Sequence, residues 1–229
     1  MAALPPLLAG RKVAVLGSAR GLGRAVAAAC EEAGAEVMGI DSEAAFDHVS
    51  AFYRFEAGDP LAMDAVAAAL PEGLDGLALL TSGGLGAALA APKRLATLVA
   101  PRMAQGGAIV AQAAPVTGDW QASLALTRAA AALRPGDEPA FAAQWSLAQE
   151  PALEARAIGW GMLAFVLAHH ARWPGIRLNA LTTDPMIDPN PAAMAAVFLL
   201  SPLSAGLSGA NLAADGGRSA RIQTSLDGL

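Results

Sequence analysis

Val13-Ala14-Val15-Leu16-Gly17-Ser18-Ala19-Arg20-Gly21-Leu22-Gly23 is an apolar run that leads into three glycines spaced G-x-x-x-G-x-G, and an alanine-rich segment follows. The apolar run predicts a buried strand, and the alanine-rich segment predicts a helix. Gly17 permits a tight turn, Gly21 lets the backbone approach a pyrophosphate, and Gly23 allows the helix to pack closely on the strand. The helix N-terminus offers free N–H groups and a positive dipole to an anion. The stretch therefore predicts a dinucleotide-binding loop whose contact residues are Gly17, Ser18, Arg20, Gly21, Leu22 and Gly23.

Composition limits the class of protein. The chain has 229 residues, which fit one α/β domain spanning 1–229 that buries roughly 70–75% of its unfolded surface. Because acidic residues outnumber basic ones, 20 to 15, and no basic run occurs, we expect no nucleic-acid partner. With 55% hydrophobic and 15% charged residues, the surface should be apolar enough to favour oligomerisation.

Targeting and membrane signals are weak. Residues 1–8 lack the positive flank and continuous apolar core of a signal peptide, so we expect a cytoplasmic protein. The longest helical stretch without formal charge, 157–171, is shorter than the ~18–20 residues that cross a bilayer, so we expect a core helix and no membrane association. Cys30 stands alone and is expected to be a buried side chain.

Short apolar runs alternate with helix-compatible segments along most of the chain. They lie at 13–16, 37–40, 52–55, 77–80, 108–111, 176–180 and 210–213. Runs that are apolar on both faces are typical of a parallel sheet covered by helices. The pattern predicts a single-domain Rossmann fold: a doubly wound, seven-stranded parallel sheet with helices on both faces and a ligand crevice at the carboxyl ends of the strands.

An additional helical segment follows the fifth strand. Residues 118–151 contain two helical patterns separated by Arg134-Pro135-Gly136-Asp137. Two interpretations carry equal weight: a surface decoration, or an element that governs which faces of the protein can associate.

Four further motifs accompany the glycine loop. They are Leu74-Asp75-Gly76-Leu77, 106–110 (Gly-Gly-Ala-Ile-Val), 175–180 (Gly-Ile-Arg-Leu-Asn-Ala), and a C-terminal set of 198–202 (Phe-Leu-Leu-Ser-Pro), Gly209 and 215–217 (Asp-Gly-Gly). In this order they resemble the short-chain dehydrogenase/reductase family over almost the whole chain. The inserted segment resembles that of bacterial 3α-hydroxysteroid dehydrogenase/carbonyl reductases. The resemblance implies a Rossmann fold and an oxidoreductase that uses NAD or NADP.

The resemblance also indicates which cofactor to expect. Asp41, at the end of the second strand, can accept both hydrogen bonds of an adenosine ribose diol and would repel a 2′-phosphate, which favours NAD over NADP. Arg20 argues for NADP, but the carboxylate should lie closer to the ribose. Asp41 could otherwise be a plain turn residue at the strand end.

Three more positions match the family's cofactor site. Asp59 corresponds to an acidic residue near the adenine amino group, and it could equally be the N-cap of a helix that begins at Pro60. Ser82 and Gly83 belong to Thr81-Ser82-Gly83-Gly84, which stands where the family has Asn-Asn-Ala-Gly, so the small backbone is kept while the amide side chains are lost.

The family's catalytic residues have no counterpart here. Active relatives place a Tyr and, four residues later, a Lys on one helix face, and the Lys lowers the pKa of the Tyr phenol. Alignment on the 175–180 motif puts these positions at Leu153 and Ala157, while the only tyrosine, Tyr53, lies in the third strand. The catalytic Ser position falls at Ala113 or Ala114, and the Asn position falls at about Ala88.

Two segments are shorter than in the family. Only 25 residues lie between Gly83 and Ile109, about half the usual number, and Thr183-Asp184 replaces the Pro-Gly after the sixth strand. Residues 185–193 are too few for the usual lid, so we expect an open crevice.

Other notable side chains have simpler explanations. His169 and His170 end the long helix predicted at 153–172, where they suit the helix dipole, and the four tryptophans are expected in the core or an interface. Asp184 and Asp188 are expected to form turns next to prolines. No spacing of ligand residues suggests a metal site.

These observations favour an NAD(H)-binding protein of this fold that lacks the Ser-Tyr-Lys set and acts as a sensor, a scaffold or an inactive partner subunit. It would form a homo-oligomer or a hetero-oligomer with an active relative, with the long helix as a contact face. The alternative is a working NAD-dependent oxidoreductase on a ketone or secondary alcohol that uses Thr117, Arg156 or water as proton donor.

Overall fold

The computed structural model describes residues 6–56, 58–81, 83–113, 115, 123–184 and 186–221. Its centre is one seven-stranded sheet in the order β3-β2-β1-β4-β5-β6-β7, with every neighbouring pair parallel. The strands are β1 (Lys12–Leu16), β2 (Glu36–Asp41), β3 (Ala51–Arg54), β4 (Gly76–Leu79), β5 (Ala108–Ala113), β6 (Arg177–Thr183) and β7 (Asn211–Ala214). The predicted doubly wound parallel fold is confirmed. The predicted bounds differ by one residue at β1, β2, β3, β4 and β7. β5 continues two residues beyond its predicted end, and β6 starts one residue later and ends three residues later than predicted.

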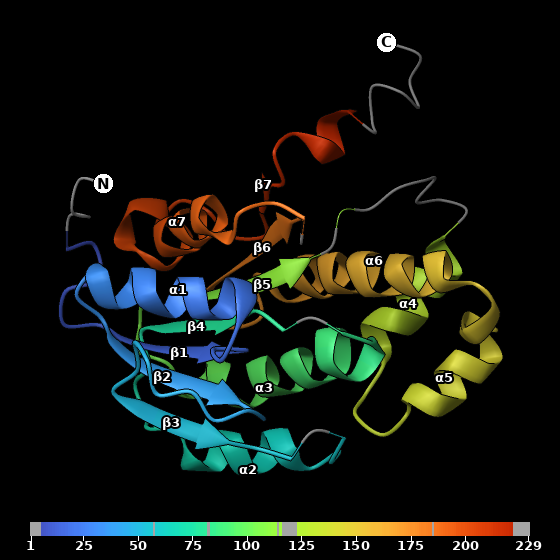
Figure 1. Ribbon diagram of the computed structural model, residues 1–229, viewed down its shortest axis with the longest axis horizontal. Coiled ribbons are helices and arrows are strands. Elements are labelled where there is room, and N and C mark those ends of the chain that lie inside the picture. The colour runs from blue at the N-terminus through green and yellow to red at the C-terminus, as the bar shows by residue number, and fades with distance from the viewer. Residues whose placement is uncertain are drawn as a thin grey trace.

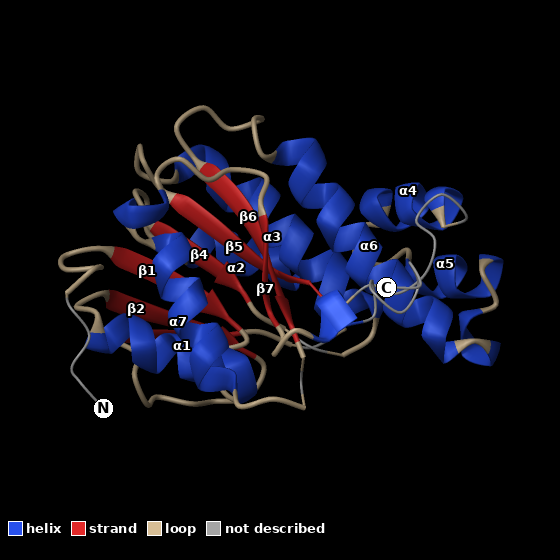
Figure 2. Ribbon diagram, turned by 90° about the horizontal axis from the view of Figure 1, so that it is seen from above, coloured by secondary structure: helices blue, strands red, loops and turns tan. Residues whose placement is uncertain are grey.

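Helices cover both faces of the sheet (Figures 1 and 2). On one face, α1 (Gly21–Glu32) packs against α7 (Pro189–Leu200). On the other lie α2 (Ala62–Ala69), α3 (Ala91–Val99) and α6 (Pro151–His169). Short helical turns η1 (Gly86–Ala90), η2 (Ala100–Arg102), η3 (Leu147–Gln149) and η4 (Pro202–Ser204) complete the connections. Two separate apolar clusters form the core, one under each helical layer, because the strands are apolar on both faces.

The segment after β5 is helical, as predicted. It contains α4 (Leu124–Ala132) and α5 (Glu138–Gln144), and α4 packs on α6. Figure 1 shows α4 and α5 beyond the carboxyl ends of the strands.

The long helix α6 has the length and hydropathy of a membrane-spanning helix, the only one with both among the described residues. In this fold it packs against β5, β6 and α4, and residues such as Met162 and Phe165 are buried in the core. The helix α6 is therefore a core helix, as the sequence predicted.

The motif at 175–180 holds the C-terminal part of the sheet together. The guanidinium of Arg177 donates to the backbone carbonyls of Leu199, Ser201 and Ser204, where α7 and η4 end. The amide of Asn179 donates to Leu207 O and accepts from Ala210 N–H. These two side chains tie β6 to the segment that precedes β7.

Candidate functional site

The glycine loop has the geometry that its spacing predicts. Gly17 has φ +89° and Gly21 has φ +54°, a region that favours glycine. A Cβ at Gly23 would lie 1.9 Å from Gly17 O, and one at Gly17 would lie 2.6 Å from Leu80 O. The start of α1 therefore packs on the loop backbone, the loop packs on the backbone that follows β4, and a Cβ fits at neither Gly17 nor Gly23.

The N-terminus of α1 is open to a ligand. No side chain caps it, and its first turn contains no acidic residue. The free N–H groups and the helix dipole therefore favour a bound anion at this point. Leu22 and Gly21 line the adjoining pocket, whereas Ser18 is 2% exposed and its Oγ lies against Gly39. The Ser18 side chain therefore does not line the pocket, and its contact with a cofactor stays a prediction.

Asp41 stands at the end of β2 beside this loop. It is 7% exposed and lines the pocket. Its Oδ2 accepts from Ala19 N–H at 3.0 Å and its Oδ1 from Glu43 N–H at 3.2 Å. Asp41 therefore fixes the loop and also presents a buried carboxylate to the pocket.

Arg20 is turned towards a different partner. It is exposed, and its guanidinium pairs with Glu43 at 2.9 Å. Among the described residues that line the pocket, Arg20 is the one basic side chain, and since this ion pair neutralises it, the local charge is dominated by carboxylates.

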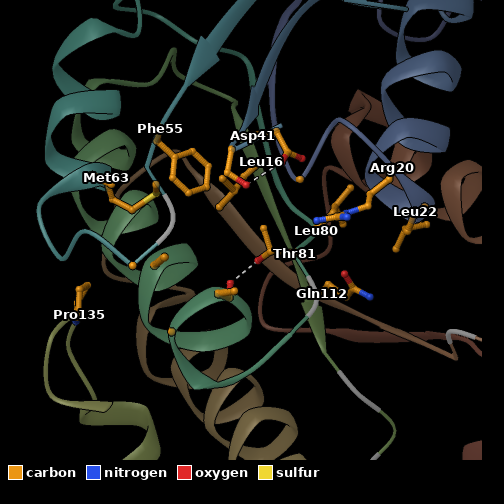
Figure 3. A pocket seen from close by; sticks show the side chains of 18 of the residues that line it. Leu16, Arg20, Leu22, Asp41, Phe55, Met63, Leu80, Thr81, Gln112 and Pro135 are labelled. Carbon is orange, nitrogen blue, oxygen red and sulfur yellow. Dashed lines mark hydrogen bonds between the residues drawn. The ribbon is translucent and has the colours of Figure 1, made fainter. Parts of the chain in front are cut away.

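These residues line a pocket of about 870 Å³ at the carboxyl ends of the strands. Figure 3 shows Arg20 and Leu22 at one side, Phe55 and Met63 at the other, and Asp41 and Thr81 between them. Gly23 and Gly83 do not line it: Gly23 packs on Gly17, and Thr81, Gly86 and Ala87 form the wall near Gly83. Ser82 lies outside the described residues.

Asp59 lines the pocket next to Pro60, as its predicted role requires. The helix after it begins at Ala62 rather than Pro60, so the predicted helix start is wrong. The Asp59 carboxylate accepts from Leu61 N–H at 2.8 Å, in the turn that precedes α2. Pro60 belongs to this turn and not to the helix.

The expected catalytic positions hold apolar side chains. Ala113 is 1% exposed at the end of β5, Ala88 is 8% exposed in η1, and Ala157 is fully buried in α6. Leu153 is partly buried and packs on the core, and Tyr53 lies in β3. Ala114 and Thr117 lie outside the described residues.

Arg156, the other donor considered, does not line the pocket. Its Nε is buried and has no hydrogen-bond partner among the described residues.

Two polar residues at the pocket were not predicted. Gln112, near the end of β5, donates through Nε2 to Thr183 Oγ1 at 3.0 Å, and its buried Oε1 has no partner among the described residues. Their positions at the carboxyl ends of β5 and β6 are the signal that could have revealed them, because ligands bind at these ends in parallel sheets.

The segment between β6 and α7 forms tight turns, as expected. Asp184 Oδ1 accepts from Met186 N–H, and Asp188 Oδ1 accepts from Asn190 N–H at the start of α7. The Met186 bond and the hydrogen bond from Arg218 hold the pKa of Asp184 below its ordinary value. Both aspartates also line the pocket.

The remaining candidates are structural. Burial raises the pKa of the Cys30 thiol to about 12, so it is no reactive thiolate. His169 and His170 bond to carbonyls of the preceding helical turn, and His169 stacks on Trp173. Within the described ranges, no group of three or more His, Cys, Asp or Glu side chains could hold a metal ion.

A scan of protein-family models and a search among curated proteins find no match to this chain. Among solved structures, a 3-alpha-hydroxysteroid dehydrogenase from Pseudomonas sp. B-0831, complexed with NADH, matches at a TM-score of 0.77 and 24% identity, over 93% of this chain and 98% of that one. A short chain dehydrogenase/reductase family protein matches at 0.70 and 20% identity, over 93% and 99%. A citronellol catabolism dehydrogenase from Pseudomonas aeruginosa PAO1 also matches at 0.70 and 20% identity, over 94% and 98%. These likenesses confirm that the chain has the fold of the short-chain dehydrogenases/reductases.

Proposed function

We propose that this protein binds NAD(H) in the pocket at the carboxyl edge of the sheet and does not carry out the proton transfer of the Tyr-Lys type. In this proposal it acts in the cytoplasm as a sensor, a scaffold or an inactive partner subunit. The observation that carries the proposal is the combination of a complete glycine cradle with apolar side chains where a proton donor would stand.

The residues of the pocket fit a dinucleotide. The cradle at Gly17 and Gly23 would be blocked by any Cβ, and the uncapped start of α1 offers N–H groups to a pyrophosphate. The Asp41 carboxylate suits a ribose diol and would repel a 2′-phosphate, so we expect NAD rather than NADP. The solved structure of the Pseudomonas sp. B-0831 enzyme contains NADH, which supports the same choice.

A bound nicotinamide can give or accept a hydride, but the reaction on a carbonyl also needs a proton. General acid–base catalysis contributes roughly 10²–10⁴ in rate. Leu153, Ala157 and Ala113 can neither hold nor move a proton. We therefore expect binding of NADH without appreciable turnover.

Association with another subunit would give such a protein a role. Several large apolar side chains are exposed, among them Leu167 on α6 (62%), Leu203 (66%) and Met186 (86%). We propose that they contribute to a homo-oligomer or to a hetero-oligomer with an active relative. Co-purification from the native cell distinguishes these two assemblies. Recovery of a relative in stoichiometric amount supports the hetero-oligomer, and recovery of homomers alone contradicts the hetero-oligomer.

Calorimetric titration with NADH, followed by an assay on a panel of ketones and secondary alcohols, tests the main proposal. Binding without turnover supports it. Turnover would favour the alternative, an oxidoreductase that uses an atypical donor such as Arg156 or water. If the protein shows no NADH binding and no turnover, both functions are contradicted.

A further inference from the structure

The turn between α4 and α5 forms one wall of the pocket. Pro135, Gly136 and Glu138 all line it. A Cβ at Gly136 would lie 3.5 Å from Pro60 Cβ, in the segment that leads to α2, and the Oε1 atom of Glu138 lies 3.2 Å from the Cβ position of Gly86 in η1. The turn therefore bridges two elements that border the pocket, a role that neither interpretation of the inserted segment foresaw.

The turn is held from both sides. Before it, the Nζ of Lys93 donates to Ala130 O at 2.6 Å and to Ala131 O at 2.9 Å, in the last helical turn of α4. After it, Phe141 of α5 is buried in the same core cluster as the α3 and α6 side chains. Because Lys93 itself is only 4% exposed, these contacts fix the position of the turn relative to α3.

Glu138 brings an oriented acceptor to this wall. Its Oε2 accepts from Gly136 N–H at 2.7 Å, which directs the carboxylate back over the turn. Its Oε1 has no hydrogen-bond partner among the described residues and faces Gly86 at the pocket wall. A carboxylate accepts hydrogen bonds and donates none, so the group it recognises must carry a hydroxyl or amino hydrogen.

We propose that the α4–α5 turn is a binding element for the nucleotide: Pro135 and Gly136 cover the side of the pocket next to Pro60, and Glu138 accepts a hydrogen bond from a hydroxyl group of the bound ligand. This inference rests on the proposed NAD(H) binding and adds a specificity residue to it.

The test compares variants of one turn by calorimetric titration with NADH. Glu138→Ala should weaken NADH binding about tenfold, since a hydrogen bond to a charged group is lost. Glu138→Gln keeps one carbonyl acceptor and should lose less affinity. The control is Arg134→Ala, on the same turn but outside the pocket; among the described residues its side chain makes one ion pair, the exposed one with Asp137. This variant should bind NADH as the wild type does.

Hydrogen exchange gives a second readout that does not depend on substitution. On adding NADH to the wild-type protein, amides of residues 133–138 should become more protected, while those on the exposed face of α4 should not change. Unchanged or tighter binding by Glu138→Ala, or an unprotected turn in a protein that binds NADH, would overturn the inference and leave the proposed function intact. If the wild type binds no NADH, both are contradicted.

Discussion

Two regions of the molecule border the same pocket and differ in what they retain. The loop region, residues 12–41, has glycines in backbone contact, an uncapped helix N-terminus and a buried carboxylate. The helix region, formed by β5 and α6, keeps the backbone of the family fold but presents Ala113, Leu153 and Ala157. The difference teaches that the glycine loop and the positions expected to hold a proton donor lie on separate elements of this fold, so their side chains can vary independently.

The largest expected effect comes from filling the cradle of the loop region. Gly23→Val places a side chain where even a Cβ would lie 1.9 Å from Gly17 O, so the loop must move. We expect a loss of NADH affinity of about 100-fold or more, with a melting temperature several degrees lower. Gly206→Ala, which adds a methyl group in open space, is the matched control. Wild-type NADH affinity in Gly23→Val would show that the ligand binds elsewhere.

The next effect concerns Lys93, which links α3 to the inserted segment. Burial lowers the pKa of Lys93 from 10.5 to about 8. Between these values the folded protein has released a proton that the unfolded chain still binds, so the free energy of unfolding should rise with pH, by on the order of 3 kcal/mol at most. Urea unfolding at several pH values measures this.

The Lys93→Met variant is the control for that experiment. It should lack the rise between pH 8 and 10.5 because its side chain does not titrate. An identical rise in the variant would assign the pH dependence to another group.

A smaller effect is expected on cofactor choice in the loop region. Asp41→Asn keeps the shape of the side chain and removes its charge, so a 2′-phosphate is no longer repelled. We expect the ratio of NADPH to NADH dissociation constants to fall about tenfold. Asp47→Asn, an exposed carboxylate that pairs with Arg24 outside the pocket, should leave the ratio unchanged. An unaltered ratio in Asp41→Asn would mean that another residue excludes the phosphate.

The smallest effect is expected at the ion pair between Arg218, which follows β7, and Asp184 at the pocket. Arg218 is half exposed and pairs with Asp184 at 2.8 Å. Since ion pairs with an exposed partner contribute little, Arg218→Ala should change NADH affinity by less than about twofold. A large loss would reveal that the segment after β7 takes part in closing the pocket, and stopped-flow release of NADH would detect it.

The amino-acid sequence by itself determined the sheet, the glycine loop and the apolar side chains at the positions where we expected catalytic residues. These follow from local causes: runs that are apolar on both faces, positions where only glycine fits, and side-chain types that cannot transfer a proton. The sequence could not determine that Ser18 faces β2, that the helix after Asp59 starts at Ala62, or that Gln112 and Thr183 pair across neighbouring strands.

Only the tertiary structure decided the place of the α4–α5 turn. Its composition is that of any polar turn, and its position depends on Lys93 bonding to α4 and on packing against Pro60, contacts between residues far apart in the chain. Such contacts depend on where each helix packs on the sheet. Local propensity carries no information about that, because side-chain packing selects the arrangement after the elements have formed.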